Sequence, residues 1–244
     1  SVVIIMPLPT ISTPTYEMVL PSSNRKIKYR PFLVKEEKIL ILAMESQDSK
    51  QIARAVKDVI SKCILSKGIK VERLSTFDIE YLFLNIRGKS VGEQIEVMVT
   101  CPDDKKTQVP MSINIDTIKV KTDDAHSTDI KLDDIYTLRM KYPSLDEFIK
   151  SNFNFDTNMN VDDTFDLIAS CIDQVYSDEE SWSHQECTKK ELTEFVDQLN
   201  SSQFKEVEKF FETMPKLSHT VKVTNPNTKV ESEIVLEGLQ NFFG

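Results

Sequence analysis

The apolar residues of this chain change their spacing along its length, and these changes limit the folds it can adopt. Between residues 34 and 87 they recur every three or four positions, as in helices with one buried face. From Gln94 to Met140 they alternate with polar residues, as in half-buried strands. Helical spacing returns after residue 144 and alternation after residue 220. This order predicts an α+β protein with an N-terminal arm and β-hairpin, helical groups, a small antiparallel sheet and a C-terminal β-hairpin.

Several of the expected helices have recognisable ends. The helix over residues 77–87 is predicted to begin at a capping box in residues 75–78 and to end at Gly88. Thr188 begins a second capping box, and the two helices between it and Pro215 are expected to form a helical hairpin. The expected helices cover residues 34–45, 49–65, 77–87, 144–153, 162–176, 188–199 and 201–211.

Two β-hairpins are predicted near the ends of the chain. The first lies in residues 16–32 and turns at Pro21–Asn24, and the last lies in residues 220–236 and turns at Asn225–Thr228. Both turns combine proline with asparagine or serine, which favour the backbone angles of tight turns. We therefore expect an antiparallel strand pair at each end.

The pattern V-x-V-T-x-P-x-x-K occurs twice, at residues 97–105 and 221–229, and predicts two hairpins of similar build. Zinc ribbons place ligands in two such turns, because tetrahedral zinc needs four converging side chains. Here the first turn carries only Cys101, and the second has Asn225 in the same place. We therefore expect ribbon-like hairpins without a metal.

The chain divides into four predicted regions. Three prolines among the first 14 residues favour an extended arm. The regions are residues 1–15, the extended arm; residues 16–93, a β-hairpin plus helical subdomain; residues 94–142, a small antiparallel β subdomain; and residues 143–244, a helical hairpin region that ends in a ribbon-like β-hairpin.

Charge and composition argue against several classes of function. The formal net charge is −9, so the chain repels a phosphate backbone and nucleic acid is not expected as its main partner. No stretch reaches the roughly 18 apolar residues of a membrane-spanning helix, so no membrane segment is expected. The 4 cysteines form no CxxC pair, and only 5 glycines occur, which argues against a disulfide framework and against phosphate-binding loops.

The sequence offers no convincing catalytic group. His126, His184 and His219 lie far apart, and no nucleophile motif accompanies them. We therefore predict no catalytic residue, no cofactor and no metal ligand. The remaining candidates are protein contacts.

Two groups of residues are candidates for contact with a partner. A cluster of cations on the tip and second strand of the first hairpin favours docking to an acidic partner over binding to nucleic acid. An aromatic pair at the C-terminal end of the sequence either packs on the fold or inserts into a neighbour. The candidate contact residues are therefore Arg25, Lys26, Lys28, Arg30, Phe242 and Phe243.

Three blocks of sequence resemble the baseplate hub assembly proteins of T-even-type contractile-tailed bacteriophages and their marine relatives. They are residues 28–38 with 43–46, residues 77–87 with 89–93, and residues 234–243. The resemblance implies a non-enzymatic hub subunit or hub-assembly factor that binds other hub and tail proteins. It also implies presence in the host cytoplasm during assembly, and leaves open whether the protein stays in the virion baseplate and whether it forms homo- or hetero-oligomers.

A second class of function stays open beside this one. Ribbon-like hairpins also suit an adaptor that binds a metal or nucleic acid. Bound zinc, or DNA binding that weakens with salt, would favour the adaptor.

Overall fold

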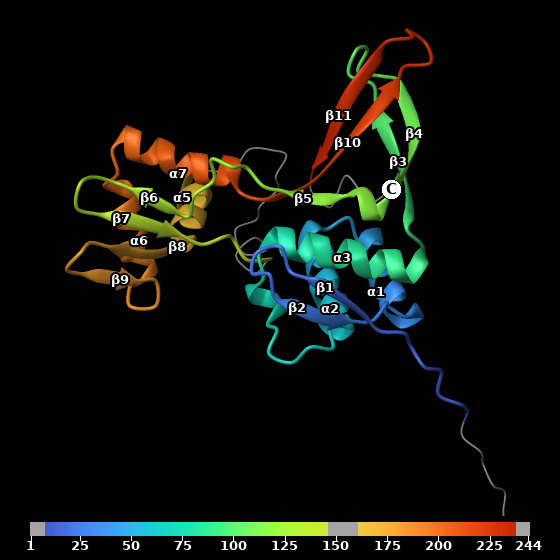
Figure 1. The fold of residues 1–244 in the computed structure, drawn as a ribbon, viewed down its shortest axis with the longest axis horizontal. Coiled ribbons are helices and arrows are strands. Elements are labelled where there is room, and N and C mark those ends of the chain that lie inside the picture. Colours follow the sequence, from blue (N-terminus) through green and yellow to red (C-terminus); the bar gives the residue numbers. More distant parts are fainter. Residues whose placement is uncertain (1–7, 146–160, 238–244) are drawn as a thin grey trace, which may run out of the picture.

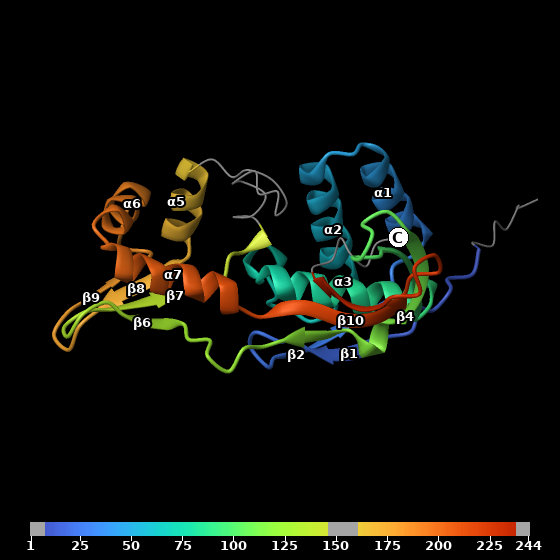
Figure 2. The ribbon, with the colours of Figure 1, turned by 90° about the horizontal axis from the view of Figure 1, so that it is seen from above.

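The computed structural model describes residues 8–145 and 161–237. They form two parts along the long axis of the molecule (Figures 1 and 2). One part holds three helices below a pair of long hairpins, and the other holds three helices on a four-stranded sheet. The predicted α+β class is confirmed, with six α-helices and several small antiparallel sheets in the described residues.

The first part is built on the N-terminal hairpin and the helices that follow it. The two hairpin strands pair antiparallel, as predicted, and their apolar side chains meet those of the helices in one buried cluster. Ile27, Val59, Ile60 and Leu82 lie at its centre, with no exposed surface. The elements are β1 (Tyr16–Val19), β2 (Lys26–Tyr29), α1 (Val34–Glu45), α2 (Ser49–Cys63), the 3₁₀ helix η1 (Val71–Arg73) and α3 (Thr76–Val91).

Helix α3 begins where predicted but ends later. The Ser75 side chain accepts a hydrogen bond from the Asp78 N–H, which confirms Ser75 as the N-cap. The Asp78 carboxylate, which would complete the predicted capping box, accepts from Ser22. The predicted end at Gly88 is wrong, because the helix continues to Val91 and is capped by Gly92, whose φ is +117°. Gly88 serves packing instead, since a Cβ at this position would lie 3.3 Å from Cδ1 of Ile115. The glycine lets the hairpin layer approach the helix.

Two long hairpins pack face to face above α3 (Figure 1). The first pairs β3 with β4, and the second pairs β10 with β11, as predicted for the C-terminal hairpin. A short strand, β5, adds to the other edge of β10. Their shared core includes Ile95, Ile118 and Leu217, together with Leu84 from α3. The elements are β3 (Gln94–Thr100), β4 (Gln108–Asn114), the 3₁₀ helix η2 (Ile115–Thr117), β5 (Lys119–Lys121), β10 (Lys216–Thr224) and β11 (Glu231–Glu237).

The second part is a four-stranded antiparallel sheet with three helices on one side (Figure 2). The strands follow the order β6-β7-β8-β9. Leu138, Cys171 and Val207 have no exposed surface and lie in the core between sheet and helices. The elements are β6 (Asp129–Lys131), β7 (Thr137–Met140), α5 (Val161–Ser170), β8 (Ile172–Tyr176), β9 (Ser181–Ser183), α6 (Lys189–Asp197) and α7 (Ser201–Thr213).

The predicted helix over residues 162–176 is half wrong. Helix α5 ends at Ser170, and the segment from Ile172 forms strand β8. Ile172 pairs with Met140, and Val175 pairs with Leu138. Ile172 and Val175 are buried in the strand, as they would be in a helix. Their spacing therefore did not distinguish a helix from a strand. Pairing with the edge of β7 stabilises this segment as a strand.

The single small sheet expected between Gln94 and Met140 is also wrong. The strands are antiparallel, but they belong to three different sheets. β3 and β4 form their own pair, β5 joins β10, and β6 and β7 join β8. The last two pairings connect segments far apart in sequence, which alternation alone does not reveal.

The later helices agree with prediction in position. The Thr188 and Glu191 capping box of α6 is confirmed, and α7 follows after a short connection. Helix α6 packs against α5. Most of the expected helix at residues 144–153 lies outside the described residues. Phe242 and Phe243 also lie outside them. Among the helices of the described residues, none is both long and apolar enough to cross a membrane.

Candidate partner-binding surfaces

The cations of the first hairpin all have partners within the protein. Lys26 Nζ lies 2.5 Å and Lys28 Nζ 3.7 Å from the Glu17 carboxylate. The guanidinium of Arg25 donates to the carbonyl oxygen of Lys67 at 3.1 Å. The single carboxylate of Glu17 offsets only part of the positive charge of Arg25, Lys26 and Lys28. The docking role assigned to these residues stays a prediction.

Arg30 forms a buried ion pair. Its guanidinium donates to Glu36 Oε1 at 3.1 Å and to Oε2 at 3.3 Å, and the Leu33 N–H donates to Glu36 Oε2 at 2.7 Å. The Glu36 side chain has no exposed surface, and burial alone would raise its pKa. The hydrogen bonds from Arg30 and Leu33 outweigh burial and lower the pKa of Glu36. This pair fixes the start of α1 against β2.

Helix α1 exposes large apolar side chains on its outer side, in addition to those it packs inward. Ile39 and Leu40 pack on the first core cluster. On the outside, Val34 is 80% exposed, Ile41 51% and Leu42 56%. Lys38 and Glu45 are exposed among them, and apolar side chains gathered on an exposed surface mark a contact site more often than single ones do. The outer face of α1 is therefore a candidate contact surface.

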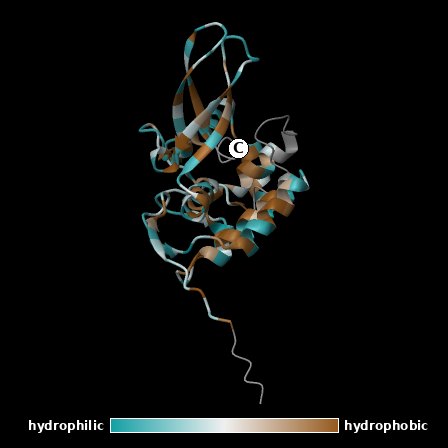
Figure 3. Cartoon of the chain, turned by 90° about the vertical axis from the view of Figure 1, so that its right-hand side faces the viewer, coloured by the Kyte–Doolittle hydropathy of each residue, from teal (hydrophilic) through white to brown (hydrophobic). Residues whose placement is uncertain are grey.

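The N-terminal arm provides a second exposed apolar surface. The described residues 8–15 form neither helix nor strand, and Leu8 and Ile11 are almost fully exposed. Figure 3 shows the arm leaving the body of the protein with brown, apolar segments along it. The chain has no charged side chain before Glu17. This composition suits contact with another apolar surface.

The two hairpins predicted to be alike have turns of similar build. In the first turn the Cys101 N–H donates to the carbonyl of Thr107 at 2.8 Å, and the Lys105 N–H donates to the Cys101 carbonyl at 2.9 Å. In the second turn the Lys229 N–H donates in the same way to the Asn225 carbonyl, and the Asn225 N–H donates to the Val230 carbonyl, each at 2.9 Å, so the second turn closes one residue earlier than the first. Lys105 and Lys229 both have a positive φ, 56° and 65°. The sequence repeat therefore corresponds to a structural repeat.

The tips of these hairpins are joined by hydrogen bonds. The amide of Asn225, which is 1% exposed, donates to Asp103 at 3.0 Å and to Asp104 at 3.0 Å. The Thr228 hydroxyl donates to Asp103 as well. Hydrogen bonds from Thr228 and Asn225 lower the pKa of Asp103. Hydrogen bonds from Thr107 lower the pKa of Asp104 by more than the pKa of Asp103 is lowered. We call this group of side chains the tip clamp.

The tip clamp does not have the composition of a metal site. Tetrahedral zinc requires sulfur, imidazole or carboxylate ligands around one point. Between these tips the buried group is the amide of Asn225, which points its donor at the two carboxylates. No cluster of three or more histidine, cysteine, aspartate or glutamate residues that could hold a metal occurs in the described part of the chain.

His126 lies where the two parts of the molecule meet. Its Nδ1 is 2.9 Å from the Thr213 hydroxyl, and its Nε2 is 3.0 Å from the Tyr142 hydroxyl. Its ring stacks on Tyr142, which in turn contacts Phe77 at the start of α3 edge-on. Because Thr213 donates its proton to the Lys209 carbonyl, it accepts from Nδ1, and Tyr142 donates to Nε2. Burial lowers the pKa of His126 and keeps the ring neutral.

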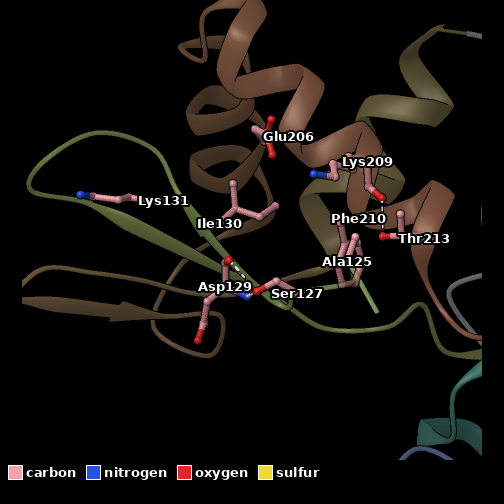
Figure 4. A pocket seen from close by; sticks show the side chains of 9 residues that line it. All are labelled: Ala125, Ser127, Asp129, Ile130, Lys131, Glu206, Lys209, Phe210 and Thr213. Atoms are coloured by element: carbon pink, nitrogen blue, oxygen red, sulfur yellow. Dashed lines mark hydrogen bonds between the residues drawn. The ribbon is translucent and has the colours of Figure 1, made fainter. Parts of the chain in front are cut away.

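A shallow pocket lies between β6 and α7 (Figure 4). Its walls include Asp129, Ile130 and Phe210. Asp129 is held by Arg139, whose Nε lies 2.7 Å from Asp129 Oδ1. Lys131 and Lys209 also line the pocket, but Figure 4 shows them separated on different elements. This mixture of charges does not form a nucleophile with an adjacent base.

Sequence reasoning missed the outer face of α1 as a contact surface. The helix itself was predicted, but its apolar residues were treated as one core stripe. The available signal was the run Ile39–Ala43, five consecutive apolar residues that cannot all face one side of a helix. The three candidate histidines are not brought together either, because His126 is bonded at the junction and His184 bonds the Ile172 carbonyl.

In the described residues, the surface carries exposed apolar side chains on α1 and on the N-terminal arm. The family model of the T4 bacteriophage base plate protein matches residues 13–244, so the chain belongs to that family. Its role is a structural one in the phage baseplate, in a family that is generally non-enzymatic, and it interacts with other tail proteins. No curated protein and no solved structure matches the chain.

Proposed function

We propose that this protein is a hub component or hub-assembly factor that binds other tail proteins while the contractile tail is assembled in the host cytoplasm. Family membership supports a baseplate role, and the three blocks that resemble hub-assembly proteins support the hub. The observation that carries the binding role is the exposed apolar face of α1. Free in water, this face would be an aggregation hazard, so a partner that covers it is expected.

The partner of α1 is a helix of another tail protein. Val34, Ile41 and Met44 follow one another at spacings of seven and three residues, and each is at least 45% exposed. This is the spacing of the seam along which two helices pack. The uncharged arm with Leu8 and Ile11 adds contact area beside it. The further candidates for contact are Arg25, Lys26, Lys28, Arg30, Phe242 and Phe243.

The test is co-expression with the other tail proteins of the same phage, followed by affinity capture. We expect the intact chain to capture a hub protein, and the double variant Ile41→Asp with Leu42→Asp to lose at least about tenfold in capture. Deletion of residues 1–15 should weaken capture as well. Met98→Asp is the matched control, because Met98 is 60% exposed on β3, outside α1.

Each outcome bears on the proposal. Equal capture by the α1 variant and the control would remove α1 from the contact. If no tail protein is captured and the purified protein retains zinc or DNA, the adaptor function replaces the hub function.

A further inference from the structure

The sheet of the second part has two turns at its outer end. Thr137 pairs with Tyr176, and Tyr176 pairs with Ser181, so the turn before β7 and the turn before β9 lie at the same end of the sheet. Figure 1 shows this end as the extremity of the molecule farthest from the paired hairpins. We call residues 131–136 together with residues 177–182 the distal tip.

The distal tip exposes large apolar side chains. Ile135 is 65% exposed, Tyr136 37% and Trp182 40%, and the rings of Tyr136 and Trp182 lie 6.2 Å apart. Trp182 is the only tryptophan of the chain. Exposed tryptophan and tyrosine are the residues that most often dominate binding at protein interfaces. Because Tyr136 and Trp182 lie together at an extremity of the fold, they are placed to contact another protein.

Both turns are held in place before any partner arrives. Asp133 accepts hydrogen bonds from the Ile135 N–H at 2.8 Å and the Tyr136 N–H at 2.6 Å, and Gln203 of α7 donates to the Leu132 carbonyl at 2.9 Å. In the other turn, the Ser177 N–H donates to the Glu180 carbonyl at 2.8 Å. Such preorganisation reduces the entropy lost on binding.

The distal tip is strongly acidic around its apolar residues. It carries five carboxylates, on Asp133, Asp134, Asp178, Glu179 and Glu180, and one cation, Lys131. Lys131 lies 3.7 Å from the exposed carboxylate of Asp134. Within the described residues, Asp178, Glu179 and Glu180 form no salt bridge and are exposed.

We propose that the distal tip binds a basic segment of another tail protein, with lysine or arginine side chains on the carboxylates and an apolar or guanidinium group on Tyr136 and Trp182. This inference rests on the proposed function, and it adds the site and the chemistry of the partner. The partner is a different protein and not a second copy, because two copies that each carry a formal net charge of −9 repel one another. Lys26 and Lys28 of β2 also share the Glu17 carboxylate, and Arg30 pairs with buried Glu36.

The experiment is affinity capture with the co-expressed tail proteins of the same phage, using the full chain. The test variant is Asp178→Lys with Glu179→Lys and Glu180→Lys. The control variant is Glu206→Lys with Glu208→Lys and Glu212→Lys, three exposed carboxylates on α7 with the same change in charge. We expect the test variant to lose capture at least about tenfold and the control to lose less than about threefold.

Trp182→Ser should reduce capture by a similar factor, and its circular dichroism and melting temperature should match those of the intact chain. Capture by the intact chain should also weaken steeply as salt rises from about 50 to about 500 mM, because the contact is between opposite charges. With the captured tail protein as the probe, tryptophan emission should shift to shorter wavelength on mixing, since Trp182 is the only tryptophan.

The outcomes separate the two proposals. If the test variant captures a tail protein as well as the intact chain does, the distal tip is not the site, and the proposed function stands. If the intact chain captures no tail protein, both proposals fail. If the intact chain forms dimers in sedimentation that the test variant does not form, the partner is a second copy and the inference is overturned.

Discussion

At the scale of single residues, Asn225 shows how side-chain hydrogen bonds join two hairpins. Its side-chain NH₂ donates to two carboxylates, and its side-chain Oδ1 accepts from the Asn227 N–H at 2.9 Å. Because Asn225 is buried, loss of any of these hydrogen bonds leaves its former partner buried and without water to replace the bond. The hydrogen-bonding side chain occupies the place that a ligand takes in a zinc ribbon.

Two replacements of Asn225 should distinguish the effect of losing a hydrogen-bond donor from the effect of adding a negative charge. Asn225→Ala should lower the free energy of unfolding by about 1–3 kcal/mol, the usual cost of unpaired buried groups. Asn225→Asp should cost more near neutral pH, because a third carboxylate then faces Asp103 and Asp104. Urea unfolding measures both.

The two variants should converge as the pH falls toward about 4, because a protonated aspartate at position 225 can donate again. An aspartate variant as stable as the alanine variant at neutral pH would mean that the carboxylates are not held toward this position.

At the scale of elements, α3 shows how packing sets the choice of residue within a helix. The sequence locates its start, because Ser75 is a local cap. It does not reveal why Gly88 lies inside the helix, because the cause is Ile115, which packs there from the next layer. Asp78 is similar, since its carboxylate accepts hydrogen bonds from the backbone and hydroxyl of Ser22 in the first hairpin.

Gly88→Ala tests this packing. Alanine favours a helix over glycine by about 1 kcal/mol, but forcing a methyl group against a buried side chain costs about 1–3 kcal/mol. Ile115 is 3% exposed and has little room to move, so we expect net destabilisation. Adding Ile115→Val should recover stability relative to Gly88→Ala alone. Thermal unfolding of the three variants gives the comparison, and a stabilised single variant would contradict the close contact.

The same scale shows what could be predicted from the sequence. Helix caps and hairpin turns use neighbouring residues, so Ser75, Thr188 and the turn at Asn225 were found. The pairing of β5 with β10 and of β7 with β8 depends on distant segments, so it was missed. The distal tip combines two turns far apart in sequence, and only the fold places them together. The predicted region boundaries at residues 15, 93 and 142 stay predictions.

At the scale of the whole molecule, His126 connects the two parts. It bonds Tyr142 and Thr213, which lie on two other connections between the parts. Protonation would remove the lone pair on Nε2 that accepts from Tyr142. The charged groups that act on this cluster are Asp123, which raises the pKa of His126, and Asp78, which raises that of Tyr142; burial dominates at both residues.

The pH dependence of stability follows from the lowered pKa of His126. The unfolded chain binds a proton near the ordinary histidine pKa of about 6.5, and the folded chain binds it only at lower pH. The stabilisation from neutral His126 is therefore present above about pH 6.5 and is lost as the pH falls below it. The stability difference between the intact chain and His126→Gln should shrink between about pH 7.5 and about pH 5 in urea unfolding. A constant difference would contradict a neutral, buried imidazole.

The central claim is that this chain is a baseplate component that acts through its contacts, and infection tests it most directly. A stop codon would be placed early in its gene in the phage genome, and tails would be counted by electron microscopy after infection. The claim predicts that complete contractile tails are absent, that the intact chain supplied in the host restores them, and that Ile41→Asp with Leu42→Asp does not, although it folds. Normal numbers of infectious particles without the protein would contradict the claim.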